Sequence, residues 1–142
     1  MTPEFPDKPN CTFCRIVEAG DELIAEGDLA VAFWDSYPLN PGHALIIPRR
    51  HDPDFFNLSA DEQAALFSLL PEVREACSAR GQADGFNIGI NVGLAAGQTI
   101  GHVHLHLIPR VVGDSDPLGD GSLDPRGGVR WVVPDRADYW ND

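Results

Sequence analysis

Polar and apolar residues alternate strictly between positions 101 and 108, where the chain reads Gly-His-Val-His-Leu-His-Leu-Ile. Strict alternation is typical of a half-buried β-strand, because side chains two positions apart project from the same face. The polar positions are all histidines: His102, His104 and His106. The apolar positions behind them are Val103, Leu105 and Leu107. The pattern predicts a row of imidazoles on a rigid strand whose other face lies in the core.

Other apolar runs predict further strands and one long helix. Strands are expected at 23–26 and 29–34, joined by a two-residue hairpin turn at Gly27-Asp28. Two more are expected at 43–48 and 85–92, and a short helical turn is expected at 15–20.

The long helix is predicted between Ser59 and about residue 80. Ser59 and Glu62 have the spacing of a capping box, and apolar residues then recur at helical intervals. Gly81 should end the helix, and Pro71 should kink it. Cys77 falls on the apolar stripe, which favours a place in the core over a reactive role.

The chain has 142 residues, of which 43% are hydrophobic, so it can form one domain with a core. We expect an N-terminal arm at 1–10, a domain at 11–110 and a Gly-, Asp- and Pro-rich tail at 111–142. The N-terminus does not resemble a signal peptide, and no apolar run is long enough to span a membrane. Membrane association is therefore not expected.

The charge and the cysteine content exclude some classes of protein. A formal net charge of −12 makes DNA or RNA a poor partner, although a local positive pocket could still hold a small phosphorylated ligand. Three cysteines are an odd count, which argues against a disulfide framework and for a reducing compartment. We expect a cytoplasmic protein.

Cys11 and Cys14 form a Cys-x-x-Cys motif whose role the motif alone leaves open. The motif is compatible with half of a zinc site, with free structural thiols or with a redox pair. A four-cysteine zinc ribbon is excluded because the chain has no second such motif. Two histidines could complete a Cys₂His₂ set instead.

Three interpretations of the histidine row compete. A single catalytic zinc cannot bind all three imidazoles, because the row spans roughly 13 Å on a strand while Zn–N bonds are about 2.0 Å. A purely polar face is the second interpretation. In the third, the central His104 is a nucleophile towards phosphorus and His106 donates to the phosphate oxygens. His102 is then free to bind a structural ion with Cys11, Cys14 and His51.

A ligand could lie next to the row. In the strand at 85–92, Asn87, Gly89 and Asn91 share a face without bulky side chains, which predicts a shallow trough. The small-residue loop at 93–99 ends in Gln98 and Thr99 and suits phosphate oxygens.

The His-x-His-x-His pattern, preceded by Gly97-Gln98-Thr99, resembles the motif of the histidine-triad (HIT) nucleotide hydrolases and transferases. The similarity covers nearly the whole stretch from residue 11 to residue 110. It also includes the following segments: Phe33-Trp34-Asp35, Pro41-Gly42-His43, Arg49-Arg50-His51 and Asn91. The segment from Asp124 to Trp131 resembles a bacterial branch of this superfamily, with Hint-like phosphoramidases and diadenosine polyphosphate hydrolases as its relatives.

The resemblance implies a role for each matching position. His104 matches the nucleophile that becomes nucleotidylated, and His106 and His43 match the histidines that support it and the phosphate. Asp35 matches the carboxylate that binds the ribose. The apolar walls around the purine correspond to Phe13, Ile16 and Phe33, and the residues near the phosphate or leaving-group oxygens to Asn91, Gln98 and Thr99. The ligands of a structural zinc, one per chain, correspond to Cys11, Cys14, His51 and His102.

The resemblance also implies an α+β fold: an antiparallel sheet of about five strands with one long helix, paired as a homodimer. The implied activity is hydrolysis at the α-phosphate of a nucleoside phosphoramidate or a dinucleoside polyphosphate, through a covalent intermediate on His104. Transfer to another acceptor, or nucleotide sensing with weak turnover, are the alternatives. Gly101 departs from the pattern, since a bulkier residue usually stands there, and we expect this to alter packing near the leaving group.

Overall fold

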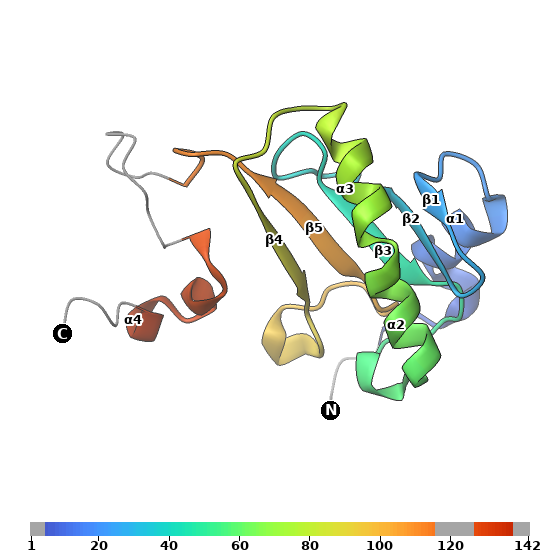
Figure 1. Cartoon of the computed structure of the whole chain (residues 1–142). Helices are drawn as coiled ribbons and strands as arrows, with labels where there is room; N and C mark the ends of the chain where they lie inside the picture. The colour runs from blue at the N-terminus through green and yellow to red at the C-terminus, as the bar shows by residue number, and fades with distance from the viewer. Residues whose placement is uncertain (1–4, 116–126, 138–142) are drawn as a thin grey trace.

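The computed structural model describes residues 5–115 and 127–137. Five antiparallel strands form one open sheet in the order β1-β2-β3-β5-β4, and helices pack on both of its faces (Figure 1). The strands are β1 (Ala25–Glu26), β2 (Ala30–Trp34), β3 (Ala44–Pro48), β4 (Gly85–Ile90) and β5 (Leu105–Arg110). The helices are α1 (Thr12–Ala19), α2 (Ala60–Ser68), α3 (Leu70–Ser78) and α4 (Pro134–Ala137), with short 3-10 turns between them. The α+β prediction is confirmed.

Each face of the sheet carries its own apolar cluster. On one face, α2 and α3 contribute Leu66 and Val73, which pack on Ile46 and Leu105 of the central strands. On the other face, α1 contributes Phe13 and Cys14 to a cluster that includes these strand residues: Val31, Phe33, Leu45 and Ile47. This second face is also the one towards which His106 projects, because His106 is the direct cross-strand partner of Leu45.

The long helix is present but broken into two parts. Ser59 and Glu62 form the predicted capping box, with Ser59 accepting from the Glu62 N–H and Glu62 accepting from the Ser59 N–H. The break falls at Leu69, two residues before Pro71, because proline has no N–H with which to continue the helical ladder. Cys77 is buried and donates its S–H to the Gly42 carbonyl at 3.0 Å, so the core assignment is confirmed.

Three local predictions need correction. The alternation predicts a strand through all three histidines, but β5 begins at Leu105, because the Val103 N–H bonds to the Asp52 carbonyl at 2.8 Å outside the β ladder. The hairpin turn lies one residue later than predicted, since Gly27 N–H bonds to Ala30 O. The alternation that puts Asn87 and Gly89 on one face of β4 predicts that Ile88 faces the core on the other, but Ile88 is 47% exposed because β4 is the outermost strand, beyond α2 and α3 (Figure 1).

Helix α1 is longer than the expected turn at 15–20. It begins directly after Cys11, whose Sγ accepts from the Cys14 N–H at 3.4 Å and so caps the first turn. It ends at Gly20, which has the left-handed conformation (φ 67°) that glycine adopts without strain. The Cys-x-x-Cys motif therefore lies at the N-terminus of a helix, with both thiols buried.

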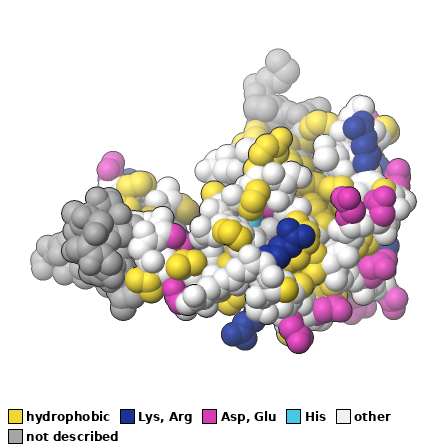
Figure 2. All heavy atoms as spheres, turned by 90° about the horizontal axis from the view of Figure 1, so that it is seen from above, with side chains coloured by type: hydrophobic (Ala, Val, Ile, Leu, Met, Phe, Trp, Pro, Cys, Tyr) yellow, Lys and Arg dark blue, Asp and Glu magenta, His cyan; other side chains and the backbone are white. Residues whose placement is uncertain are grey.

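The described part of the tail, residues 127–137, lies beyond the β4 edge of the sheet (Figure 1). Most of the Gly-, Asp- and Pro-rich stretch and of the segment that resembles the bacterial branch lies outside the described residues, as do residues 1–4 of the arm. No helix in the described part of the chain is long and apolar enough to cross a membrane. Figure 2 shows one face from above, with Asp and Glu side chains gathered on the side of α1 and β1 and few Lys or Arg side chains.

A half-buried ion pair between Arg50 and Glu62 joins α2 to the end of the segment that follows β3, and it supports a stability prediction. The Glu62 carboxylate accepts from Nε and Nη2 of Arg50 at 2.9–3.2 Å and is almost fully buried. These bonds, with that from the Ser59 N–H, lower the pKa of Glu62 from 4.5 to about 2. Glu62→Gln should therefore cost about 2 kcal/mol of unfolding free energy at pH 7, measured by chemical denaturation.

The acid dependence of this loss follows from the direction of the pKa shift. A carboxyl group with a lowered folded pKa contributes stability above its unfolded pKa and loses it as the pH falls through the folded pKa. The difference between wild type and Glu62→Gln should thus shrink from pH 4.5 to pH 2. Glu72→Gln, at an exposed position on α3, is the matched control. A difference that stayed constant down to pH 2 would contradict the assignment.

Candidate functional site

Strand pairing brings residues that are distant in the sequence into rows across one face of the sheet. Phe33 pairs with Leu45, Leu45 with His106, and His106 with Gly89, so these four positions follow one another across four strands. Among the described residues, no heavy atom outside Gly89 and its two chain neighbours lies within 4 Å of the position that a Gly89 Cβ would occupy, so this part of the sheet is open beside His106. The face thus runs from an apolar side on β2 and β3, past the histidine, to an open floor on β4.

The His104 ring is held in one tautomer by its backbone contact. Its Nδ1 lies 2.8 Å from the carbonyl oxygen of His102, and since a carbonyl can only accept, Nδ1 carries the proton. Burial lowers the pKa of His104, so the ring is neutral at pH 7. The lone pair on Nε2 is therefore available. The His104 ring packs edge-to-face against Phe13 and against His106, with centroid separations of 5.3 and 5.1 Å.

A second pair of imidazoles forms a hydrogen-bonded relay. The Leu39 N–H donates to His43 Nδ1 at 3.1 Å, so the proton of neutral His43 is on Nε2. That proton is donated to His106 Nδ1 at 3.0 Å, which leaves the His106 proton on Nε2. Burial, together with the neighbouring His104 and His43, lowers the pKa of His106 to about 4. His106 is thus a neutral donor next to the His104 ring.

Asp35 approaches this relay from the end of β2. Its Oδ2 lies 3.4 Å from His43 Nε2, and its Oδ1 accepts from the Tyr37 N–H at 2.8 Å. Asp35, His43 and His106 are close enough together to be considered as metal ligands. The tautomer of His43 argues against this, because a metal on Nε2 would put the proton on Nδ1, opposite the Leu39 N–H. We interpret the trio as a proton-ordered hydrogen-bond network.

Cys11, Cys14, His51 and His102 form the second cluster, with one ligand atom from each within 4.8 Å of the others. His102 Nδ1 lies 3.6 Å from Cys11 Sγ and 3.5 Å from Cys14 Sγ, and His51 Nδ1 lies 3.3 Å from Cys14 Sγ. A tetrahedral zinc, with Zn–N bonds of about 2.0 Å and Zn–S bonds of about 2.3 Å, has N···S edges of about 3.5 Å. The four residues therefore fit a tetrahedral metal, as the sequence predicts.

The surroundings of the cluster also fit a metal ion. His102 Nε2 donates to the Pro48 carbonyl at 2.8 Å, which directs the Nδ1 lone pair at the two sulfurs. Burial raises the pKa of the Cys14 thiol to about 11, so without a cation the thiolate that binds metals is disfavoured. A bound zinc would supply positive charge and a rigid cross-link. With four protein ligands it would have no open position for a substrate.

The apolar residues predicted around a base lie on the α1 side of the same face. Phe13 packs edge-to-face on Phe33 at 5.3 Å and connects it to His104. Ile16 and Phe33 line a cavity of about 670 Å³. The structure adds Leu23 and Trp34 to its lining, which the sequence pattern did not single out. Leu23 lies in the coil between α1 and β1, and Trp34 lies at the end of β2, so no local signal in the sequence indicated that they would meet.

The loop before the triad is arranged differently from the prediction. Both ends of the Gln98 amide are used: Oε1 accepts from the Gly93 N–H at 2.8 Å, and Nε2 donates to the carbonyls of Pro53 and Ile100. Gln98 is buried and holds the loop in shape. Thr99 and Asn91 are exposed, so their side chains remain accessible from solvent.

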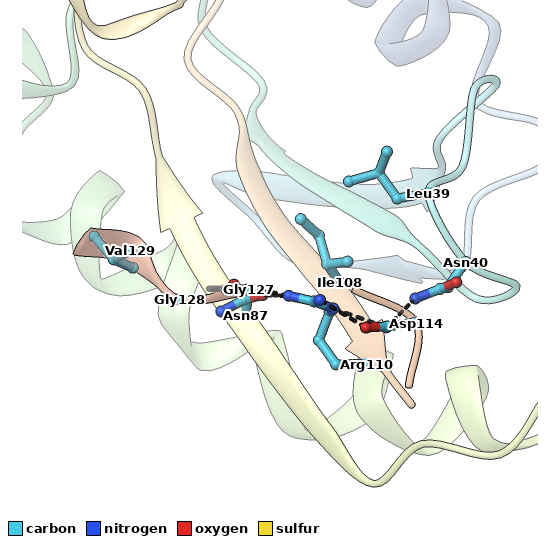
Figure 3. Close-up of a pocket in the computed structure, with 9 residues that line it drawn as sticks. All are labelled: Leu39, Asn40, Asn87, Ile108, Arg110, Asp114, Gly127, Gly128 and Val129. Atoms are coloured by element: carbon cyan, nitrogen blue, oxygen red, sulfur yellow. Dashed lines mark hydrogen bonds and ion pairs between the residues drawn. The ribbon is translucent and has the colours of Figure 1, made fainter. Parts of the chain in front are cut away.

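A further cavity of about 420 Å³ lies on the β4–β5 end of this face, shown in Figure 3. Arg110 crosses it and donates to Asp114, to Asn87 Oδ1 at 2.6 Å and to the Gly127 carbonyl at 2.8 Å. Ile108, two residues after His106 on the same strand face, also lines it. Because all the charge on Arg110 is engaged within the protein, this cavity offers little free positive charge.

Comparison with known proteins places the chain in a family. Residues 17–112 match the model of the HIT domain, and the chain belongs to the HIT family. A HIT-like protein of Saccharolobus solfataricus is 37% identical over 78% of this chain and 81% of its own. A zinc-bound histidine triad family protein of Mycobacterium smegmatis has a similar structure, with a TM-score of 0.68 and 35% identity over 77% of this chain and 81% of its own.

Two relatives carry the names of enzymes that act on nucleotides. Adenylylsulfatase HINT3 of Arabidopsis thaliana is 37% identical over 71% of this chain. The asymmetrical bis(5'-nucleosyl)-tetraphosphatase of Schizosaccharomyces pombe is 38% identical over 67% of this chain. The match spans about half of each of these two relatives, 52% in both cases.

Proposed function

We propose that the protein is a nucleoside-phosphate hydrolase that cleaves at the α-phosphate through a covalent intermediate on His104. The observation that carries this proposal is the tautomer of His104: Nδ1–H is bound to the His102 carbonyl, and Nε2 is free to attack. The names of the relatives support an enzyme that hydrolyses or transfers nucleotides.

The proposed reaction has two displacements at phosphorus. In the first, His104 Nε2 forms a P–N bond while the bond from phosphorus to the leaving group breaks; the leaving group departs with the bonding electrons, and an amine takes up one proton from solvent as it departs. The positive charge that develops on the His104 ring is stabilised through Nδ1–H by the His102 carbonyl. In the second, water attacks phosphorus, the P–N bond breaks, and one proton of the water is released. His106 Nε2–H, held by the relay from His43, donates to the phosphoryl oxygens in both steps.

We propose that the nucleoside lies on the α1 side of the histidines. Phe13, Ile16 and Phe33 would contact a purine, and Asp35 would accept from the ribose hydroxyls. Thr99 and Asn91 are exposed and available for the oxygens of the phosphate or leaving group. For Gln98 we propose an indirect contribution, through the loop that it holds together.

The leaving group would lie over the open floor next to Gly89, towards the cavity in Figure 3. An amine leaving group would make the protein a phosphoramidase, and a nucleotide leaving group would make it a dinucleoside polyphosphate hydrolase. The engagement of Arg110 favours the less charged leaving group. Transfer of the nucleotide to an acceptor other than water remains the alternative that the same intermediate allows.

We also propose a structural zinc at the cysteine–histidine cluster and a homodimer. The outer edge of β4 pairs with no other strand among the described residues. Ile88 on this strand is 47% exposed, so a second copy could cover it. A reducing, cytoplasmic environment is the one in which buried thiols at such a cluster would stay reduced.

A substrate panel tests the proposal. The values of kcat/KM should be measured for a nucleoside phosphoramidate and for dinucleoside tri- and tetraphosphates, and release of the amine or nucleotide should be followed directly. We expect the phosphoramidate to be preferred by at least about tenfold. Binding of AMP without turnover of any member of the panel would identify a nucleotide sensor instead and would overturn the proposed hydrolysis.

A further inference from the structure

Gly101, immediately before the first histidine of the triad, is covered by the ring of Phe5 from the N-terminal arm. A Cβ placed on Gly101 would overlap Cβ and Cγ of Phe5 and lie 3.1 Å from its Cδ1. Gly101 is buried, and Phe5 is partly buried. The arm is therefore held against the chain that leads into the catalytic histidines.

The backbone of Gly101 does not itself require glycine. The glycines of the described chain with positive φ are Gly20, Gly42, Gly93, Gly97 and Gly113. Gly101 is not among them, so an L-residue could adopt its conformation without strain. The missing side chain is thus explained by the space that Phe5 occupies.

Phe5 of the arm and Cys11, which follows the arm, contact two consecutive residues of this segment. Phe5 covers Gly101, and six positions later Cys11 Sγ lies 3.6 Å from the ring of His102. The carbonyl of His102 in turn accepts from His104 Nδ1 at 2.8 Å. The segment that fixes the tautomer of His104 is therefore held from outside at both Gly101 and His102.

We propose that Phe5 is a positioning residue: by packing on Gly101 it holds the His102 carbonyl where it orients His104. The inference rests on the proposed nucleophilic role of His104. Because a shift of the carbonyl would loosen the Nδ1–H contact, the loss of Phe5 acts on the chemical step and on the cysteines next to His102. Nucleotide binding on the α1 side, formed by other residues, depends on it much less.

The test compares three variants of the full chain: Phe5→Ala, Phe5→Leu, and the exchange Phe5→Gly with Gly101→Phe, in which no Cβ at position 5 competes with the new side chain. Phe5→Ala should lower kcat for a nucleoside phosphoramidate about tenfold and leave KM within about twofold. Phe5→Leu should keep most of the activity. The exchange should restore kcat, because the side chain of a phenylalanine at 101 would occupy the space that Phe5 Cβ and Cγ fill in the wild type. Phe56→Ala, at a phenylalanine that is 75% exposed, is the matched control.

A second readout is independent of turnover. Alkylation of Cys11 and Cys14, located by mass spectrometry, should be roughly tenfold faster in Phe5→Ala than in wild type, with buried Cys77 on α3 as internal reference. If wild type turns over no substrate of the panel, the proposed function fails. The alkylation rates still decide whether Phe5 holds the segment at Gly101 and His102 in place. Unchanged kcat and unchanged alkylation in Phe5→Ala would overturn the inference. A folded exchange variant that does not recover kcat would also overturn it.

Discussion

Replacing His104 with alanine should lower kcat for a nucleoside phosphoramidate by at least about 10³-fold. The reason is that Nδ1 of His104 is bound to the His102 carbonyl, so the free lone pair that attacks phosphorus in the proposed reaction is on Nε2. Binding of AMP should stay within about tenfold of wild type, because the cavity lined by Ile16 and Phe33 does not include this ring, which contacts the apolar side through Phe13. Steady-state kinetics and calorimetric titration with AMP measure the two quantities.

A second variant separates the loss of the nucleophile from the loss of packing. The five histidines of the chain all lie in one of the two clusters, so none can serve as a neutral control. His104→Gln has nearly the volume of the native ring, and its amide can still donate to the His102 carbonyl. It should be as inactive as His104→Ala but more stable. Full activity in either variant would exclude His104 as the nucleophile.

The covalent intermediate can be observed directly. Wild-type protein quenched during turnover should carry one added nucleotide on His104, detected by peptide mass spectrometry under conditions that preserve phosphoramidates. The adduct should be absent from His104→Gln. An adduct on another residue would contradict the assignment of His104 as the nucleophile. The absence of any adduct when the protein is saturated with substrate would contradict it as well.

The elements predicted from the sequence are those with local signals. The capping box at Ser59 and Glu62 specifies a helix start, and Pro71 specifies a break, because both act through backbone groups within one turn. The alternation within β5 correctly separates buried Leu105 and Leu107 from His106. In each case the physical cause lies within a few residues of the position that shows it.

The features that could not be predicted depend on contacts between distant segments. The relay from His43 to His106 requires the register in which β3 pairs with β5. No periodicity reveals that Phe5 fills the space above Gly101, since the contact spans nearly the whole chain length of the domain. The internal use of the Gln98 amide is equally invisible, because a glutamine in a loop looks the same whether it faces a phosphate or Pro53.

His102 connects the cysteine–histidine cluster to His104, so the state of that cluster should affect how His104 is oriented. Its ring points Nδ1 at the two cysteines, and its carbonyl holds the proton of His104. The Val103 N–H next to it bonds to the carbonyl of Asp52, which follows His51 of the same cluster. Anything that loosens the cysteine–histidine cluster should therefore also disturb His104, the proposed nucleophile, although a closed four-ligand site binds no substrate.

Removal of the metal should lower both stability and turnover. The purified protein should contain about one zinc per chain, and chelation or Cys14→Ser should cost at least about 3 kcal/mol, which corresponds to a fall in Tm of about 10 °C. At a temperature where the zinc-free protein is still folded, kcat should fall by about tenfold, because His102 is no longer fixed. Elemental analysis, calorimetry and kinetics on the same samples measure the three effects.

Cys77→Ala provides the matched control for this experiment. Cys77 is as buried as Cys14, but it lies on α3 and donates to the Gly42 carbonyl, away from the cluster. Its removal should cost stability through lost packing and leave the zinc content at one per chain. Protein prepared without chelators that contains no metal would contradict the zinc assignment. Full kcat in folded, zinc-free protein would show instead that the two clusters act independently, and that strand packing alone holds the His102 carbonyl in place.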